Sequence, residues 1–302
     1  MLYFVSFIFI FISVWVGNAA LALFLGIILA SLKEVPVDFF TQKYGSRILQ
    51  TGIVFLGGSL SLDSFLEINS SYFLFISLYV FTAFTLVLLV GRVLGVSKKL
   101  SYLLGSGTAI CGGTAIAAVA PTIKAKPEEL TTAISIVFLL NALAVILFPI
   151  VGDFFNLSGR EFGAWVALAI HDTASVIGAA SMMGDEAMEV AATLKVTRTL
   201  WIVPLVAGSA WFFRNKSSRF GFPLFVIFFL LATILNSLIS PSSDVTNVLK
   251  LINKVCLLTG LFCIGTQINI ESLKSISIKP VLLAVSVWVI IIPTSFWLVS
   301  VI

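Results

Sequence analysis

The sequence predicts an all-α polytopic membrane protein with about ten or eleven transmembrane helices. Hydrophobic residues make up 59% of the 302-residue chain and charged residues only 11%, and the mean hydropathy is +1.13. A soluble protein of this composition would expose far more apolar surface than soluble proteins do. The apolar residues also fall into separate segments, most of them about as long as a helix that crosses a bilayer. Both observations favour helices in a membrane.

Short polar connections, many of which contain Pro, Asn, Ser or Lys, separate these apolar segments. The segments cover residues 2–16, 18–32, 44–62, 70–91, 100–123, 130–151, 161–183, 190–212, 221–239, 247–268 and 280–302. Eleven spans follow, or ten if the first two segments form one element that is broken at Gly17-Asn18. We therefore expect one transmembrane domain over residues 1–302 and no soluble domain.

The distribution of Lys and Arg predicts the orientation, because basic residues accumulate on the cytoplasmic side of a membrane. With eleven spans, one alternate set of connections holds twelve basic residues and the other set holds four. The N-terminus is therefore expected inside and the C-terminus outside. The formal net charge of +4 then reflects topology, and no nucleic-acid partner is expected.

The segment 100–123 contains the poorest helix former in the chain, the stretch GSGTAICGGT that begins at Gly105. Each glycine weakens a helix by about 1 kcal/mol relative to alanine, which predicts an interruption between Thr108 and Thr114. Unwound backbone inside a membrane must be buried in protein or line a polar cavity. The free N–H groups around Gly112 would then form an anion site. The alternative is a small-residue face for helix packing.

An internal repeat relates two segments of the chain. Residues Thr51–Phe65 resemble Thr259–Leu273 at a constant offset of 208 residues. The copies are seven spans apart and would cross the membrane in opposite directions. Inverted repeats of this kind are typical of secondary transporters, whose binding site lies at the repeat interface. We therefore expect inverted halves over residues 18–151 and 160–302.

The repeat also predicts where a second helix interruption lies, between Thr259 and Thr266. Gly260, Gly265 and Thr266 are the residues expected at that break. A weaker similarity relates Gly113-Thr114-Ala115 to Asp172-Thr173-Ala174. These two triplets are two spans apart, so they would run in parallel, and we interpret their similarity as chance.

The glycine-rich stretch belongs to a longer motif, from Gly105 to Pro121 and followed by Lys124-Ala-Lys126, which resembles the signature of the sulfate exporter family, also called the YeiH family. The resemblance continues through most of the chain. It includes Ile170-His-Asp-Thr-Ala-Ser-Val176, Lys195-Val-Thr-Arg198 and the terminal segment around Lys279-Pro280.

Membership of this family would imply an inverted-repeat fold with crossed discontinuous helices, like that of sodium/proton antiporters and bile-acid transporters. It would also imply export of a sulfur oxyanion across the bacterial plasma (inner) membrane. Two positions depart from the family pattern. Many members have a carboxylate one methylene longer than Asp172, and an Arg near Gly58-Ser59 that this chain lacks.

Ionisable residues within apolar segments are costly and therefore suggest function. His171, the only histidine, and Asp172 lie midway along the segment 161–183. We expect them to face two walls of a cavity and to carry a coupling proton, because histidine titrates near neutral pH. The alternative is a histidine that is merely hydrogen-bonded between helices.

Lys195 and Arg198 are three residues apart and lie on one face of a helix. At a rise of 1.5 Å per residue they would be roughly 9 and 14 Å deep. Arg can bind an oxyanion through two parallel hydrogen bonds, although Lys195 could instead extend to the interface. The substrate-binding candidates are Thr108, Cys111, Gly112, Gly113, Thr114, Asn141, Thr173, Lys195 and Arg198.

The cysteines, Cys111, Cys256 and Cys263, lie in apolar segments without the spacing of a metal site or a disulfide framework. We expect no metal, no cofactor and no enzymatic activity. The leading hypothesis is a secondary transporter that exports sulfate, sulfite or an organosulfonate by alternating access. A cation/proton antiporter that uses Asp172 and a passive anion channel are the alternatives. The anion, the lipid bilayer and a coupling proton or sodium are the expected partners, and a homodimer is left open.

Overall fold

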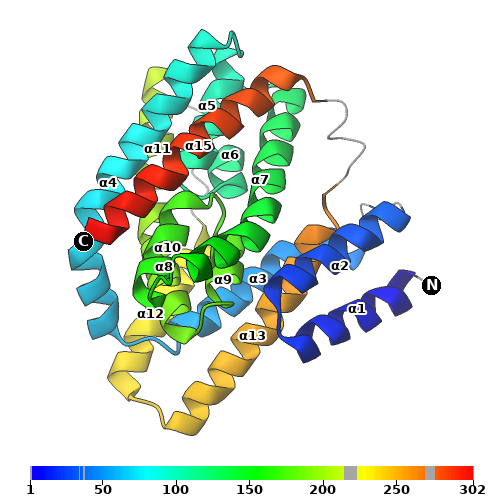
Figure 1. The fold of residues 1–302 in the computed structure, drawn as a ribbon, viewed down its shortest axis with the longest axis vertical. Helices are drawn as coiled ribbons and strands as arrows, with labels where there is room; N and C mark the ends of the chain where they lie inside the picture. Colours follow the sequence, from blue (N-terminus) through cyan, green and yellow to red (C-terminus); the bar gives the residue numbers. More distant parts are fainter. Residues whose placement is uncertain (1, 34, 37, 214–222, 269–275, 302) are drawn as a thin grey trace.

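The computed structural model describes residues 2–33, 35–36, 38–213, 223–268 and 276–301, and all its regular elements within these ranges are helices. The predicted all-α fold class is confirmed (Figure 1). Five helices in the described ranges are long and apolar enough to cross a membrane. They cover Leu62–Val93, Pro127–Phe154, Asp185–Phe212, Ser243–Gly265 and Ile278–Val301.

The helices follow the predicted apolar segments closely. In chain order they are α1 (Leu2–Val16), α2 (Ala19–Leu32), α3 (Phe40–Gly57), α4 (Leu62–Val93), α5 (Lys98–Ala109), α6 (Gly113–Val119), α7 (Pro127–Phe154), α8 (Gly159–Ala169), α9 (Thr173–Ala180), α10 (Asp185–Leu200), α11 (Ile202–Phe212), α12 (Leu224–Ile239), α13 (Ser243–Gly265) and α15 (Ile278–Val301).

Two of the predicted spans are helical hairpins that enter and leave on the same side. In hairpin 1, formed by α5 and α6, Lys99 at the start donates a hydrogen bond of 2.6 Å to the carbonyl of Lys124 just after the end. In hairpin 2, formed by α8 and α9, a β-carbon on Gly159 would lie 2.7 Å from the carboxylate of Glu186 at the start of α10. The prediction of eleven spans is therefore wrong at these two segments.

The apolar length of a re-entrant hairpin explains this error, since two short helices and one crossing helix use a similar number of residues. The 12 residues of α5 give about 18 Å of helix, which reaches only the middle of a ~30 Å hydrocarbon layer. The revised topology moves Lys124 and Lys126 to the basic side and Arg160 away from it. The division of basic residues becomes thirteen to three, and the N-terminus stays on the basic side, where the sequence predicts the cytoplasm.

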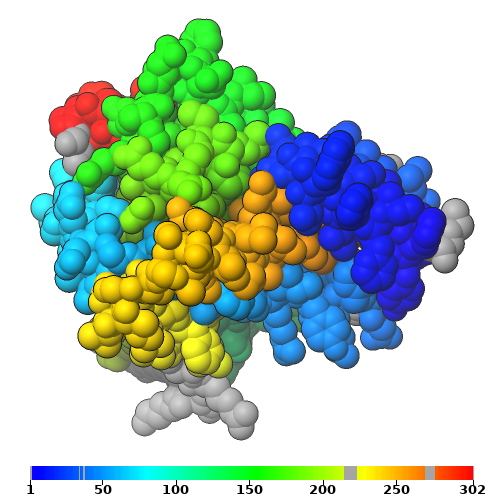
Figure 2. Space-filling view, turned by 90° about the horizontal axis from the view of Figure 1, so that it is seen from below, coloured from blue at the N-terminus to red at the C-terminus, as the bar shows by residue number. Residues whose placement is uncertain are grey.

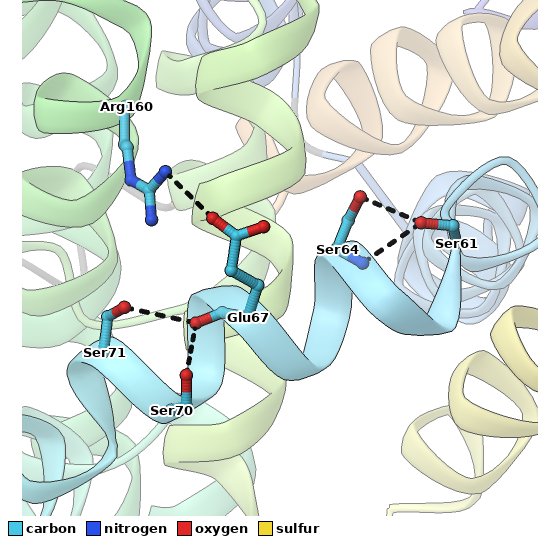
Figure 3. Close-up of polar contacts among 6 residues, drawn as sticks. All are labelled: Ser61, Ser64, Glu67, Ser70, Ser71 and Arg160. Atoms are coloured by element: carbon cyan, nitrogen blue, oxygen red, sulfur yellow. Dashed lines mark hydrogen bonds and ion pairs between the residues drawn. The ribbon is translucent and has the colours of Figure 1, made fainter.

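The base of hairpin 2 is fixed by local capping and by one surface ion pair. Ser158 and Glu161 form a capping box at the start of α8, and the hydrogen bonds from the Ser158 hydroxyl and backbone hold the pKa of Glu161 below its usual range. Figure 3 shows Arg160 reaching the carboxylate of Glu67 on α4, at 3.6 Å. Solvent reaches both side chains, which are 43% and 70% exposed, so this pair stabilises the fold little.

The helices pack as two bundles. The α13 bundle contains α1, α2, α3, α12 and α13, and the hairpin bundle contains α4 to α11 and α15. In Figure 1, α1, α2 and α3 lie beside α13, whereas the hairpins are enclosed by α4, α7, α10 and α15. Figure 2 shows the orange residues of α13 between the dark-blue N-terminal helices and the green middle of the chain.

The repeated segments of α3 and α13 lie against each other in opposite directions. A β-carbon on Gly52 would lie 2.9 Å from the β-carbon of Cys256, and one on Gly260 would lie 2.6 Å from that of Leu49. Each glycine therefore allows the backbone of the other copy to approach closely. This antiparallel pair is consistent with an inverted repeat, and the boundaries of the two halves stay a prediction.

The predicted second interruption between Thr259 and Thr266 is wrong. Helix α13 continues through Gly260 and ends at Gly265, with Thr266 as its C-cap. The glycines serve close packing, because a β-carbon on Gly265 would collide with the carbonyl oxygen of Leu23 on α2. The second interruption lies instead in hairpin 2, between Ala169 and Thr173.

Candidate functional site

The tips of the two hairpins meet at Gly112 and Asp172. Gly112 has φ +63°, and a β-carbon there would lie 3.0 Å from the β-carbon of Asp172 and 3.2 Å from its backbone nitrogen. Only glycine combines this backbone conformation with so close an approach. On the sequence alone, we interpret the similarity between the Gly113 and Asp172 triplets as chance. In the structure these triplets lie at the tips of two hairpins that enter from opposite sides.

The tip of hairpin 1 is an unwound turn, at the place where the sequence predicts an interruption. Helix α5 ends at Ala109 and α6 begins at Gly113. The Ile110 N–H donates to the Ser106 carbonyl at 3.2 Å, and the Gly112 N–H donates to the Gly107 carbonyl at 2.9 Å. No side chain caps the first N–H groups of α6.

The tip of hairpin 2 is held by its own side chains and by α7. The Asp172 carboxylate caps α9, accepting from the Ser175 N–H at 3.0 Å and from the Ser175 hydroxyl at 2.7 Å. The Asn141 side-chain oxygen accepts from the His171 N–H at 3.2 Å and lies 3.1 Å from its ring Nδ1. His171 and Asn141 are both buried, so this pair positions the tip.

Arg198 binds the carbonyl ends of both entering helices. Its Nε donates to Ala109 at 2.7 Å and another nitrogen donates to Thr108, both at the end of α5. Its third nitrogen donates to three carbonyls of hairpin 2, those of Ala167, Leu168 and Ile170. The guanidinium also lies 4.6 Å from the ring centroid of Tyr79.

Two further side chains donate hydrogen bonds to the carbonyl groups at the end of α8. Lys195 donates to the Ile170 carbonyl at 2.8 Å, and the Trp288 indole donates to the Ala169 carbonyl at 3.0 Å. The last carbonyls of a helix otherwise lack partners, and lipid cannot supply them. Lys195 and Arg198 are fully buried. They supply these carbonyls with hydrogen bonds on the side of the tips where α5 and α8 end.

A cavity of about 340 Å³ lies on the other side of the tips, between the two bundles. Helices α6, α7 and α9 form its wall in the hairpin bundle, and α3, α12 and α13 form the opposite wall. Its lining residues are Ser46, Leu49, Gln50, Ile53, Cys111, Gly113, Thr114, Ala117, Ile134, Phe138, Asp172, Thr173, Ala174, Phe225 and Ile264.

The sequence-predicted site residues divide between these two places. Cys111, Gly113, Thr114, Asp172 and Thr173 line the cavity. The others lie outside its lining: Gly112 at the tip contact, Thr108 and Arg198 at the carbonyl cluster, Lys195 beside it, and Asn141 with His171 behind hairpin 2.

Three of these residues lie away from the positions that the sequence predicts for them: Lys195, Arg198 and His171. Direct substrate contacts were expected from Lys195 and Arg198, but both are buried against carbonyls because the ends of α5 and α8 need donors. His171 was expected to face the cavity, but its ring turns toward Asn141 and Trp288. Only Asp172 of the predicted proton-coupling pair lines the cavity.

Sequence reasoning missed the contribution of α3 to the cavity. Ser46 and Gln50 line it, and Gln42, one turn earlier, donates to the Thr266 carbonyl at 2.9 Å. Residues four apart share a helix face, so the three form a polar stripe along one face of α3. That spacing is visible in the sequence and could have identified this wall.

The electrostatics of the two sides of the tips differ. Among the described residues that line the cavity, Asp172 is the only one with a formally charged side chain. Two buried basic side chains, Lys195 and Arg198, lie behind the tips. The guanidinium of Arg198 supplies positive potential there, and fields act strongly in such a low-dielectric interior. The first N–H groups of α6 add positive potential at Gly113 and Thr114.

A comparison with known proteins places the chain among bacterial membrane proteins. Residues 4–284 match the family model described as Conserved hypothetical protein 698. A UPF0324 membrane protein of Vibrio parahaemolyticus is 38% identical over 288 residues, covering 93% of this chain and 93% of its own. No solved structure matches the chain.

Two further relatives carry the same name. The UPF0324 membrane protein of Shewanella oneidensis is 39% identical over 279 residues, 92% of this chain and 88% of the relative. That of Bacteroides thetaiotaomicron is 36% identical over 281 residues, 92% and 85% of the two chains. The similarity thus covers both hairpins and the cavity between the bundles.

Proposed function

Since the chain belongs to the family described as Conserved hypothetical protein 698, whose relatives compared above are membrane proteins, we propose that it is a secondary transporter. It exports a small sulfur oxyanion across the bacterial plasma membrane by alternating access. The observation that carries this proposal is the cavity at the hairpin tips, which is lined by residues of both bundles.

Alternating access requires a binding site that two rigid bodies enclose from opposite sides. The hairpin bundle contributes Thr114 and Thr173 to the cavity, and the α13 bundle contributes Ser46 and Gln50. A rocking or sliding motion of one bundle against the other would expose this site to each side in turn. The hairpins themselves would move together, because Arg198 donates hydrogen bonds to both.

The polar groups of the cavity suit a small oxyanion. The hydroxyls of Ser46, Thr114 and Thr173 and the amide of Gln50 can donate to oxygen atoms. The N–H groups of Gly113 and Thr114 carry the partial positive charge of a helix start. Apart from Asp172, the remaining wall is apolar, so a cavity of about 340 Å³ also has room for an organic group on a sulfonate.

Arg198 acts indirectly in this proposal. Its guanidinium is bound to carbonyls and supplies positive potential through the hairpin tips instead of a bidentate contact with the substrate. Asp172, which lines the cavity, would carry the coupling proton. A proton on this carboxylate removes the one formal negative charge that faces an incoming anion.

One observation favours the second candidate, a cation/proton antiporter. Asp172 is the only formally charged side chain among the described lining residues, and a cation could pair with it directly. In that case the buried charge of Arg198 would compete with the bound cation across the tips. The third candidate is a passive anion channel, which would let an anion cross the membrane without exchanging it for another ion.

Counterflow in liposomes separates the three candidates. Liposomes that contain the protein and are preloaded with an unlabelled anion should accumulate labelled sulfate, sulfite or an organosulfonate transiently above equilibrium. A channel would only equilibrate the label. An antiporter of cations would show no anion uptake and would instead acidify or alkalinise the lumen when sodium or potassium is added.

A further inference from the structure

Five backbone carbonyl oxygens converge on one point behind the hairpin tips. Thr108 and Ala109 supply two of them from the end of α5, and Ala167, Leu168 and Ile170 supply three from the end of α8. The C-terminal ends of half-helices are negative, and in transporters such carbonyls coordinate alkali cations. A cluster with this chemistry attracts a cation.

The cation at this point is the guanidinium of Arg198, which is fully buried. We propose that the carbonyl cluster is a monovalent-cation site whose cation is covalently part of the protein. The parent protein therefore has no position for sodium at the hairpin tips. If the arginine side chain is removed, the cluster binds a free cation from solution, and guanidinium is the preferred one.

The preference for guanidinium follows from the directions of the five bonds. The Nε and one terminal nitrogen face the end of α5, while the other terminal nitrogen faces the end of α8. The ring of Tyr79 lies 4.6 Å from the central carbon of Arg198, which suits a planar delocalised cation. An ammonium group is a compact point charge and cannot bridge both helix ends in this way.

The proposal concerns a site apart from the cavity and needs no assumption about the transported substrate. It predicts that Arg198 can be replaced by a soluble ion. A purely packing role for the arginine side chain would not be restored by an ion, since the hydrocarbon stem would still be missing. Selective rescue therefore distinguishes a cation site from ordinary core packing.

The test uses the purified full-length protein with Arg198→Ala and follows thermal unfolding. We expect the substitution to lower Tm by on the order of 5 °C or more, because buried carbonyls lose their partners. Guanidinium chloride, far below denaturing concentrations, should restore at least about half of this loss, and sodium chloride less. N-methylglucamine chloride at the same ionic strength should restore none.

Arg160→Ala is the matched control, because Arg160 is an exposed arginine paired with Glu67 at 3.6 Å (Figure 3). Guanidinium should stabilise neither this variant nor the parent. Equal effects of guanidinium and N-methylglucamine on the Arg198→Ala variant would overturn the proposal.

A second measurement keeps the proposal testable if Arg198→Ala does not fold. The parent's Tm should stay the same when sodium is exchanged for N-methylglucamine at constant ionic strength, because its own guanidinium already occupies the cluster. Arg198→Lys should fold with a lower Tm that sodium does not change. Sodium-specific stabilisation that persists in an Asp172→Asn background, where the cavity carboxylate cannot pair with sodium, would mean that the cluster is open to free cations, and the proposal would be wrong.

Discussion

The β-carbon of Asp172 lies 3.0 Å from the position that a β-carbon on Gly112 would occupy. These two residues belong to hairpins that enter the protein from opposite sides, so their contact marks the centre of the molecule. The cavity begins directly beside it, at Cys111 and Gly113 on one hairpin and at Asp172 on the other. Changes at this contact should therefore affect both the fold and the binding site.

Replacement of Gly112 by alanine should destabilise the protein and abolish transport. The residue has φ +63°, a conformation that strains alanine, and such strain costs about 1–3 kcal/mol before the collision with Asp172 is counted. Thermal unfolding and uptake assays measure both effects. Gly208→Ala is the control, because nothing lies within 4 Å of a β-carbon at Gly208. A Gly112→Ala protein with the parent's Tm would show that the tips do not touch.

The re-entrant topology predicts which positions face the cytoplasm. In a variant without native cysteines, single cysteines at Lys99 and Lys124 should react with an impermeant maleimide from the same, cytoplasmic side. These two residues share a hydrogen bond of 2.6 Å, whereas eleven spans would place them on opposite sides.

A cysteine at Arg160 provides the control for this labelling experiment. It should react only from the outer side, because α7 crosses the membrane between the two hairpins. Labelling of the Lys99 and Lys124 positions from opposite faces would restore the eleven-span topology and contradict the hairpins.

Substrate should protect Cys111 from alkylation. Cys111 lines the cavity although the residue is only 2% exposed, so a bound anion would block the approach of a small reagent. Cys111→Ala should keep transport within about twofold of the parent, which corresponds to less than ~0.5 kcal/mol. Cys263, which is buried and outside the described lining, should show no protection. Equal protection of both thiols would indicate a general conformational effect.

Asp172→Asn should separate anion movement from the proton gradient and leave anion binding largely intact. Asparagine retains an oxygen that can accept from the Ser175 N–H, so the cap of α9 is kept. Transport by the variant should lose its response to an imposed proton gradient, as expected when a carboxylate of a proton relay is removed. Asp153→Asn, at an exposed position, is the control. A variant that keeps the parent's response to the gradient would remove Asp172 from coupling.

The sequence predicts the helices that are identified by the length of an apolar segment. The segments that became α4, α7 and α13 are long and apolar enough to identify individually. The unwound tip of hairpin 1 was also predictable, because glycines and threonines in the middle of a membrane segment oppose a helix. In both cases a local property of the chain determines the structure.

Direction through the membrane was not predictable in this way, because a hairpin and a span use similar apolar lengths. Gly159 shows the difference, since its contact with Glu186 depends on how α8 and α10 pack. Once the hairpins are recognised, the Gly113 and Asp172 triplets belong to segments that run in opposite directions, as in an inverted repeat. The assumption that every apolar segment crosses the membrane concealed it.

The roles of the buried charges depended on tertiary contacts as well. A deep arginine near an anion-transport motif suggests a substrate ligand, yet Arg198 meets Ala109 and Ala167 from two different hairpins. No sequence pattern states which carbonyls will lack partners after folding. The depth of Arg198 was predictable, but its partners were not.

The central claim is that the cavity at the hairpin tips carries an anion through the membrane, and counterflow in liposomes tests it most directly. Liposomes that contain the purified parent and unlabelled sulfite, sulfate or an organosulfonate should accumulate the labelled anion transiently. Liposomes with the Gly112→Ala variant should not accumulate the label, whereas liposomes with the Gly208→Ala variant should accumulate as much as those with the parent. Absence of anion counterflow in the parent, together with cation-driven proton movement that Asp172→Asn abolishes, would contradict the account.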